Sequence, residues 1–322
     1  MRIPLLQQSC FCVLTLSALA QAAQCIQLTD AQAQSVGMRL WQNESGGSIA
    51  GLTAWNAGEQ FASLGIGHFI WYPEGRRGPF EESFPPLLSF LRFSGASIPN
   101  WLSEAHGCPW ATRAEFLAAA KSQKMEELRT LLARTIGLQA RFAANRLEQA
   151  LPKMLAAAPP DKRALVQRNF SRVAALPSGA YPLVDYVNFK GEGTLETERY
   201  KGEGWGLLQV LETMGEGPAL QEFSRAADKV LTRRVQNSPP ERGEQRWLAG
   251  WRNRVRSYGG DGVSALVTPK EYEKFKAGFR KASTLRVCRI YREAVLNRPP
   301  RRHADSAVTS GGLRYPANTG PS

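Results

Sequence analysis

The sequence has few residues that bind transition metals. Its 322 residues include only five cysteines and three histidines, which stand far apart at His68, His106 and His303. Structural zinc sites use four cysteine or histidine side chains in closely spaced pairs. The only close pair here, Cys10 and Cys12, lies in the N-terminal segment discussed next. We therefore expect neither a metal site nor a cofactor.

Long apolar runs are also lacking beyond the N-terminus. No later stretch reaches the roughly 18 consecutive apolar residues of a membrane-spanning helix. The N-terminus has Arg2, an apolar run from Cys12 to Ala20 and small residues up to Ala23, which is typical of a cleaved secretory signal over residues 1–23. A short buried or interfacial helix is the alternative. We expect a mature protein that is soluble and either periplasmic or secreted.

Export changes the interpretation of the cysteines. Cys10 and Cys12 leave with the signal, so Cys25, Cys108 and Cys288 remain. An oxidising compartment permits one disulfide bond. We prefer Cys108–Cys288, with Cys25–Cys108 as the alternative. Lipidation at Cys25 would anchor the protein to a membrane, and we expect a membrane partner only if it occurs. The glutamine directly before Cys25 matches a lipobox poorly.

Acidic residues are too few to balance the basic ones. The chain has 41 lysines and arginines against 28 aspartates and glutamates, for a net charge of +13, and the basic residues concentrate between positions 233 and 302. A basic surface attracts polyanions. For an exported protein these are cell-wall glycans, anionic lipids and lipopolysaccharide rather than nucleic acid. A solvated face that keeps the protein soluble is the simpler interpretation. The oligomeric state is not indicated.

The hydrophobic pattern predicts a mainly α protein with a small β-hairpin. Hydrophobic spacing, N-caps and glycines place one helix at 29–43, a hairpin at 50–72 with its turn at 56–58, and a helix that ends near 190. Further helices are expected at 84–94, 98–104, 112–122, 125–136, 138–157, 160–176, 218–235, 239–258 and 268–296. We expect a single domain over 24–298 with a helical insertion at about 105–160, and a disordered tail over 299–322.

One stretch carries a specific chemical signal. Glu44 ends the first helix before two glycines, Glu59 lies in the expected hairpin, and Ser63-Leu-Gly-Ile-Gly-His68 follows. Glycosidases place two carboxylates across one sugar bond. We therefore predict Glu44 as the general acid, with Glu59 or a water held by Ser63 as the second group. Trp55 is expected to pack near Glu44 and to stack on sugar.

A second zone is rich in glycine. Asn188 precedes one Lys-Gly-Glu-Gly sequence, and a second copy contains Glu203 and leads into Trp205 and Gln209. Glycines permit close approach of the backbone, so these loops suit the floor of a cleft. We expect these four residues to contact substrate, with Glu203 as a reserve acid and Gln209 facing an acetamido group. Two glycine-rich helix ends without a ligand are the alternative.

These segments resemble the lysozyme-like superfamily. Glu44 followed by Ser63-Leu-Gly-Ile-Gly-His68 is similar to the phage-type lysozyme signature, which has a Glu, then an Asp or Cys, then Thr-x-Gly-x-Gly-His. The segment 183–191 looks like that family's helix ending in Phe-Asn-x-Gly, and 246–254 is similar to its late basic, tryptophan-containing helix. Gly206-Leu-Leu-Gln209 resembles a motif of goose-type lysozymes and lytic transglycosylases. The resemblance implies a lysozyme-like α+β fold with additional helices.

The sequence departs from that signature at the acidic position. Counted back from His68, this position falls on Ala57, so Glu59 would have to substitute, and Ser63 replaces the family's threonine. A transglycosylase needs only one acid/base, because a hydroxyl of the sugar itself displaces the bond. The resemblance therefore implies binding and cleavage of peptidoglycan by Glu44, with His68 ordering the hairpin and contacting substrate.

Two alternatives to this function stay open. The first is an envelope or cell-wall protein that keeps the fold and its groove but is not catalytic. The second is a basic helical envelope protein that binds a protein partner, in which case the motif match is accidental.

Overall fold

The computed structural model describes residues 26–260. The expected secretory signal, the helix at 268–296, the disordered tail and Cys288 lie outside these residues. Within them, helices dominate and β-structure is limited to two small antiparallel sheets, which confirms the predicted mainly α class with a small β part. No helix of the described part is both long and apolar enough to span a membrane.

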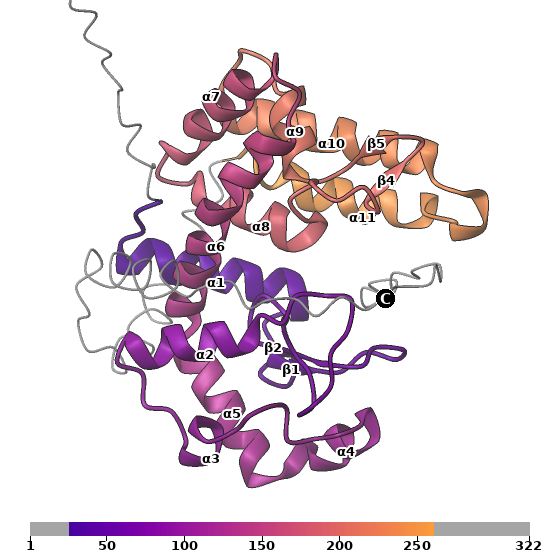
Figure 1. The fold of residues 1–322 in the computed structure, drawn as a ribbon. Coiled ribbons are helices and arrows are strands. Elements are labelled where there is room, and N and C mark those ends of the chain that lie inside the picture. The colour runs from indigo at the N-terminus through magenta and orange to yellow at the C-terminus, as the bar shows by residue number, and fades with distance from the viewer. Residues whose placement is uncertain (1–25, 261–322) are drawn as a thin grey trace, which may run out of the picture.

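The N-terminal half of the described chain surrounds a small sheet. Figure 1 shows α1 crossing the middle of the molecule, with α2 and the sheet below it. The elements in chain order are α1 (Asp30–Ser45), a 3₁₀ turn (Ala50–Leu52), β1 (Thr53–Ala54), β2 (Ala62–Leu64), β3 (Phe69–Trp71), α2 (Phe84–Phe93), α3 (Asn100–Ser103), α4 (Arg113–Ala118), α5 (Gln123–Arg134) and α6 (Ile136–Ala157).

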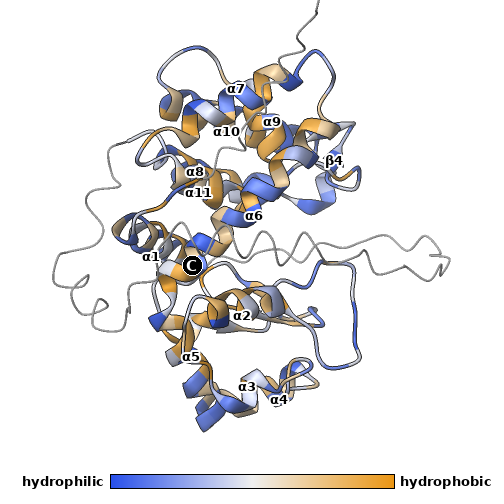
Figure 2. Ribbon diagram, turned by 60° about the vertical axis from the view of Figure 1, so that its left-hand side comes forward, coloured by the Kyte–Doolittle hydropathy of each residue, from blue (hydrophilic) through white to orange (hydrophobic). Residues whose placement is uncertain are grey.

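The C-terminal half is a helical layer above α1. It contains α7 (Arg163–Ala174), α8 (Ala180–Lys190), β4 (Arg199–Tyr200), β5 (Glu203–Gly204), α9 (Leu207–Thr213), α10 (Ala219–Asn237) and α11 (Gln245–Arg256). In Figure 1, α6 passes from the lower half into this layer. Figure 2 shows apolar residues on α8 and α9, and the buried side chains of these helices form part of the core.

The boundaries of α1 follow from its caps. The Thr29 hydroxyl accepts a hydrogen bond from the Gln32 N–H, and the Gln32 side chain accepts one from the Thr29 N–H, which completes a capping box. At the other end Gly46 adopts the left-handed conformation (φ 61°), which stops the helix. Glu44 therefore lies in the last turn of α1, one residue beyond the predicted helix end at 43.

The predicted hairpin is one strand short of the observed sheet. The turn at 56–58 connects β1 to β2 as expected, but a second reversal between Gly65 and His68 adds β3, giving the order β1-β2-β3. Both residues have positive φ, 73° and 49°. The buried Gln139 of α6 holds this turn, because its side-chain oxygen accepts a hydrogen bond from the Ile66 N–H at 3.0 Å.

Helix α6 belongs to the core although it falls in the expected insertion at 105–160. It packs along α1, and its Phe142 is buried between Phe69 of β3 and Phe90 of α2, with ring centroids 5.5 and 5.6 Å apart. The same expected insertion contains Cys108. Its thiol is buried, and both partners proposed for it, Cys25 and Cys288, lie outside the described residues.

We predict that Phe142→Ala lowers the free energy of unfolding by about 3–5 kcal/mol, because it leaves a cavity where the sheet meets α2 and α6. Urea denaturation measures this loss. Phe93→Ala is the matched control, since this side chain is 48% exposed and its truncation should change stability by less than about 0.5 kcal/mol. Equal losses for the two variants would contradict the packing described here.

Candidate functional site

A cleft of about 1180 Å³ lies between the end of α1, the β2–β3 turn and the C-terminal helical layer. Among the residues that line it are Glu44, His68, Glu81, Arg146, Asn188, Phe189, Lys190, Glu198, Tyr200, Trp205, Arg234, Arg242, Arg246, Trp247, Trp251 and Arg254. The described lining is therefore rich in both cations and aromatic rings.

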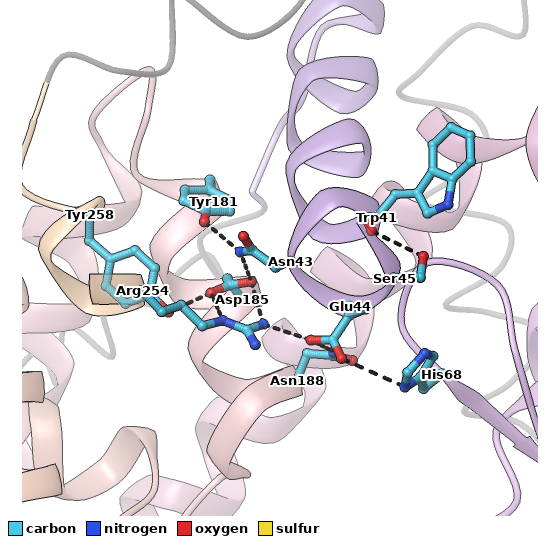
Figure 3. A network of polar contacts seen from close by, with 10 residues as sticks. All are labelled: Trp41, Asn43, Glu44, Ser45, His68, Tyr181, Asp185, Asn188, Arg254 and Tyr258. Carbon is cyan, nitrogen blue, oxygen red and sulfur yellow. Dashed lines mark hydrogen bonds and ion pairs between the residues drawn. The ribbon is translucent and has the colours of Figure 1, made fainter. Parts of the chain in front are cut away.

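Glu44 is the most heavily contacted carboxylate in this cleft. Its side chain is only 5% exposed. Its Oε1 accepts hydrogen bonds from Arg254 Nη2 at 2.7 Å and from Asn188 Nδ2 at 3.2 Å, and its Oε2 lies 3.6 Å from His68 Nδ1 (Figure 3). Glu44 is thus fixed by residues from three other parts of the chain.

Arg254 is itself held by a buried carboxylate. Asp185 of α8 is fully buried, and its two oxygens accept hydrogen bonds from Arg254 Nε and Nη2, both at 2.8 Å. Tyr258 donates to the same carboxylate at 2.5 Å. Asn43 donates to Asp185 at 3.0 Å and to the Tyr181 hydroxyl at 2.8 Å (Figure 3). These bonds satisfy a charge that would otherwise be costly to bury.

The electrostatics of this network follow from its contacts. Burial alone would raise the pKa of the Asp185 carboxyl, but the Arg254 guanidinium, with hydrogen bonds from Tyr258 and Asn43, holds that pKa below its ordinary value. Burial raises the pKa of Tyr258 well above its usual range, and the Asp185 charge adds to this. Asp185 is therefore ionised and Tyr258 is a neutral donor near neutral pH.

A basic and aromatic wall forms another side of the cleft. Arg234 of α10 lies over the Trp205 ring, 4.1 Å from its centroid, and donates two hydrogen bonds to the buried Glu244 at 2.8 and 2.9 Å. Trp247 and Trp251 of α11 stack with centroids 6.0 Å apart. Flat rings of this kind suit the apolar faces of a sugar or another planar ligand.

The structure brings four of the predicted site residues together. Glu44, His68, Asn188 and Trp205 all line the cleft. Arg254 and Asp185, which we did not assign a role, complete the arrangement around Glu44. Both stand in segments that resemble lysozyme motifs. Asp185 and Asn188 are three residues apart on one helix, and this spacing indicates that Asp185 lies on the same helix face as Asn188.

The two groups predicted to assist Glu44 lie elsewhere. Ser63 is buried in the middle of β2, where it pairs with Ile70, and Glu59 lies in the β1–β2 turn, with its backbone carbonyl accepting a hydrogen bond from Trp55 Nε1 at 2.9 Å. None of Glu59, Ser63 and Trp55 is among the described residues that line the cleft. The predicted grouping of these residues with Glu44 is therefore not observed.

Two residues of the glycine-rich zone have local roles. The Gln209 side chain accepts a hydrogen bond from the Gly206 N–H at 2.9 Å and donates one to the Gly193 carbonyl at 3.1 Å, so it joins the two loops instead of facing the cleft. Glu203 pairs with Arg233 at 3.4 Å. Neither Gln209 nor Glu203 is among the described lining residues. The second Lys-Gly-Glu-Gly copy is a β4–β5 turn.

Within residues 26–260, no three His, Cys, Asp or Glu side chains come together as a metal site. No family model, curated protein or solved structure matches this chain. The contacts around Glu44 and along the basic and aromatic wall are therefore the basis for a function.

We predict that Asp185→Asn lowers the free energy of unfolding by about 3–5 kcal/mol at pH 7, because it breaks the fully buried pair with Arg254 and leaves Glu44 as the remaining carboxylate partner of this guanidinium. The unfolded chain protonates this carboxyl near pH 4, whereas the folded chain does so only at lower pH. The stabilisation is thus fully present above about pH 5 and is lost as the pH falls through the lowered pKa of the folded state. Urea denaturation between pH 7 and pH 3 measures both effects.

Asp228→Asn is the matched control for this prediction. Asp228 pairs with Arg252 at 2.8 Å, but the two side chains are 40% and 36% exposed, so its loss should cost less than about 1 kcal/mol. Equal losses of stability in the two variants would contradict the role given to the buried pair. So would an Asp185→Asn variant that keeps the acid sensitivity of the wild type.

Proposed function

We propose that this protein is exported and binds and cleaves the glycan strands of peptidoglycan, with Glu44 as the proton donor to the glycosidic oxygen. One observation carries the proposal: the Glu44 carboxylate lies in the large cleft and is contacted by His68, Asn188 and Arg254. These four residues come from three stretches that resemble phage-type lysozymes, namely the signature from Glu44 to His68 and the segments 183–191 and 246–254. Accidental matches would not be expected to converge on one carboxylate.

The charges around Glu44 are compatible with proton donation. One guanidinium, that of Arg254, serves two carboxylates, Glu44 and Asp185. Because Asp185 is buried and makes two hydrogen bonds to Arg254, it can neutralise this guanidinium alone. Arg254 therefore keeps a carboxylate partner while Glu44 acts on a ligand. Asn188 and His68 keep its carboxyl group oriented toward a strand in the cleft.

The position of Glu59 outside the cleft lining is compatible with a mechanism that uses one carboxylate. The described residues of the lining include only two other carboxylates, Glu81 and Glu198, and they do not include Glu59. An inverting or retaining hydrolase needs a second carboxyl group at a defined separation across the bond. Displacement by a hydroxyl group of the sugar itself needs only the acid/base at Glu44, so we propose the transglycosylase type of cleavage.

A non-catalytic glycan-binding protein is the second candidate. The observation that favours it is the 2.7 Å ion pair between Glu44 and Arg254, which gives this carboxylate a structural partner within the protein. In this case the tryptophans and arginines of the cleft hold a strand and no bond is broken.

We predict that Glu44→Gln lowers the release of soluble fragments from purified peptidoglycan by about 10²–10⁴-fold, the usual contribution of a general acid. Glutamine keeps the shape and one acceptor of the side chain, so binding should persist. Chromatography of the released fragments measures cleavage and also identifies anhydro ends, which a transglycosylase leaves. Sedimentation with insoluble cell wall measures binding.

Glu59→Gln and Glu203→Gln are the controls, because both remove a glutamate that lies outside the cleft lining, and both should retain wild-type release. Sedimentation of the wild type without any release would support the non-catalytic candidate. Absence of both sedimentation and release would refute both candidates, and unchanged release by Glu44→Gln would refute the role of this residue.

A further inference from the structure

Lys190 has an unusual position in the cleft wall. It is the last residue of α8, and its ammonium group lies over the Trp251 ring and the Phe189 ring, 3.5 and 3.9 Å from their centroids. Ring faces attract a cation but carry no negative charge. No hydrogen bond or ion pair joins Lys190 to another residue within 26–260.

Three neighbouring arginines have carboxylate partners. Arg234 and Arg242 share the buried Glu244, at 2.8 and 3.2 Å. Arg254 has Asp185 and Glu44. Lys190 differs from these arginines, because no ion pair joins it to a carboxylate within the described residues.

Burying this ammonium group costs free energy, and no ion pair with another described residue offsets that cost. Burial lowers the pKa of Lys190 well below its usual range, and the nearby charge of Arg234 lowers it further. Glu244 and Glu44 act in the opposite direction, and Arg254 again lowers it. A negative group bound at Lys190 would restore the balance, because an adjacent anion favours the charged amine.

We propose that Lys190 binds a carboxylate of the glycan ligand, so that the cleft prefers acidic amino-sugar strands over neutral ones. This inference rests on the proposed function and names its substrate class. A carboxylate bound at Lys190 would supply the counter-charge that the described residues do not give it through an ion pair. The carboxylate can be attached to the sugar ring itself or belong to a peptide on the strand, since the chemistry at Lys190 is the same. Trp251, which contacts the lysine, also lines the cleft and can stack on the adjoining sugar.

Calorimetric titration tests this proposal with three probes. These are a neutral N-acetylglucosamine hexamer, peptidoglycan strands from which an amidase has removed the peptides, and strands that keep their peptides. All proteins carry Glu44→Gln so that no strand is cleaved during the titration. We expect the parent protein to bind at least one acidic strand about tenfold to a hundredfold more tightly than the neutral hexamer, the usual gain from a charge-assisted contact.

Lys190→Met should remove this preference while leaving affinity for the neutral hexamer within about twofold, because methionine keeps an apolar chain between the two rings. Lys190→Arg should restore part of the preference, since it restores the charge. Lys229→Met is the matched control: it removes one lysine from the exposed face of α10, outside the cleft, and should bind like the parent. Thermal unfolding of each variant verifies its folding.

The outcomes separate this inference from the proposed function. Equal binding of neutral and acidic strands by the parent, or an acidic preference that survives Lys190→Met, overturns the role of Lys190 and leaves glycan binding intact. No binding to any of the three probes overturns both. Tight binding of stripped strands assigns the carboxylate to the sugar, and tight binding of only the intact strands assigns it to the peptide. If Lys190→Met does not fold, Lys190→Arg decides the question. A Lys190→Arg variant that keeps the parent's preference for acidic strands supports the proposal, and a Lys190→Arg variant that has lost this preference overturns it.

Discussion

The buried ion pair between Asp185 and Arg254 fixes the geometry of the candidate site. It joins α8 to α11 through two residues that lie 69 positions apart along the chain. Arg254 also reaches Glu44 on α1, which lies 210 positions before it. A buried pair of this kind adds little net stability but is costly to break. Its effect here is to set the position of α11 relative to α1, and this position defines one side of the cleft.

A second buried carboxylate positions the basic side chains of the cleft wall, as Asp185 positions Arg254. Glu244 is almost fully buried just before α11 and accepts hydrogen bonds from Arg234, Arg242 and Tyr200. Burial alone would raise its pKa, but the Arg234 contact keeps that pKa below the ordinary value. One carboxylate thus draws basic side chains from two elements toward the aromatic rings. The wall therefore keeps Arg234 and Arg242 in place, whereas Lys190 makes no ion pair among the described residues.

Local patterns predicted the elements better than the site. The caps at Thr29 and Gly46, and the motif that ends at His68, are encoded within a few residues, so α1, the first two strands and the cleft positions of Glu44 and His68 could be anticipated. The third strand was missed because it depends on a turn in which Gly65 and His68 have positive φ and the Ile66 N–H donates to Gln139 of α6. Gln209 was misassigned because its bonds to Gly193 and Gly206 are set by how two loops meet. The pairing of Arg254 with Asp185 and Glu44 is likewise tertiary, and no spacing in the chain reveals it.

The sharing of Arg254 ties the cleft to the buried core. Asp185 receives hydrogen bonds from Arg254, Tyr258 and Asn43, so this carboxylate holds the guanidinium from inside the protein. Glu44 receives fewer hydrogen bonds and lines the cleft, so it is the carboxylate of the pair that a bound ligand can reach. Because one guanidinium contacts both carboxylates, a change at Asp185 also alters the support of Glu44, and the buried pair and the candidate site act as one unit.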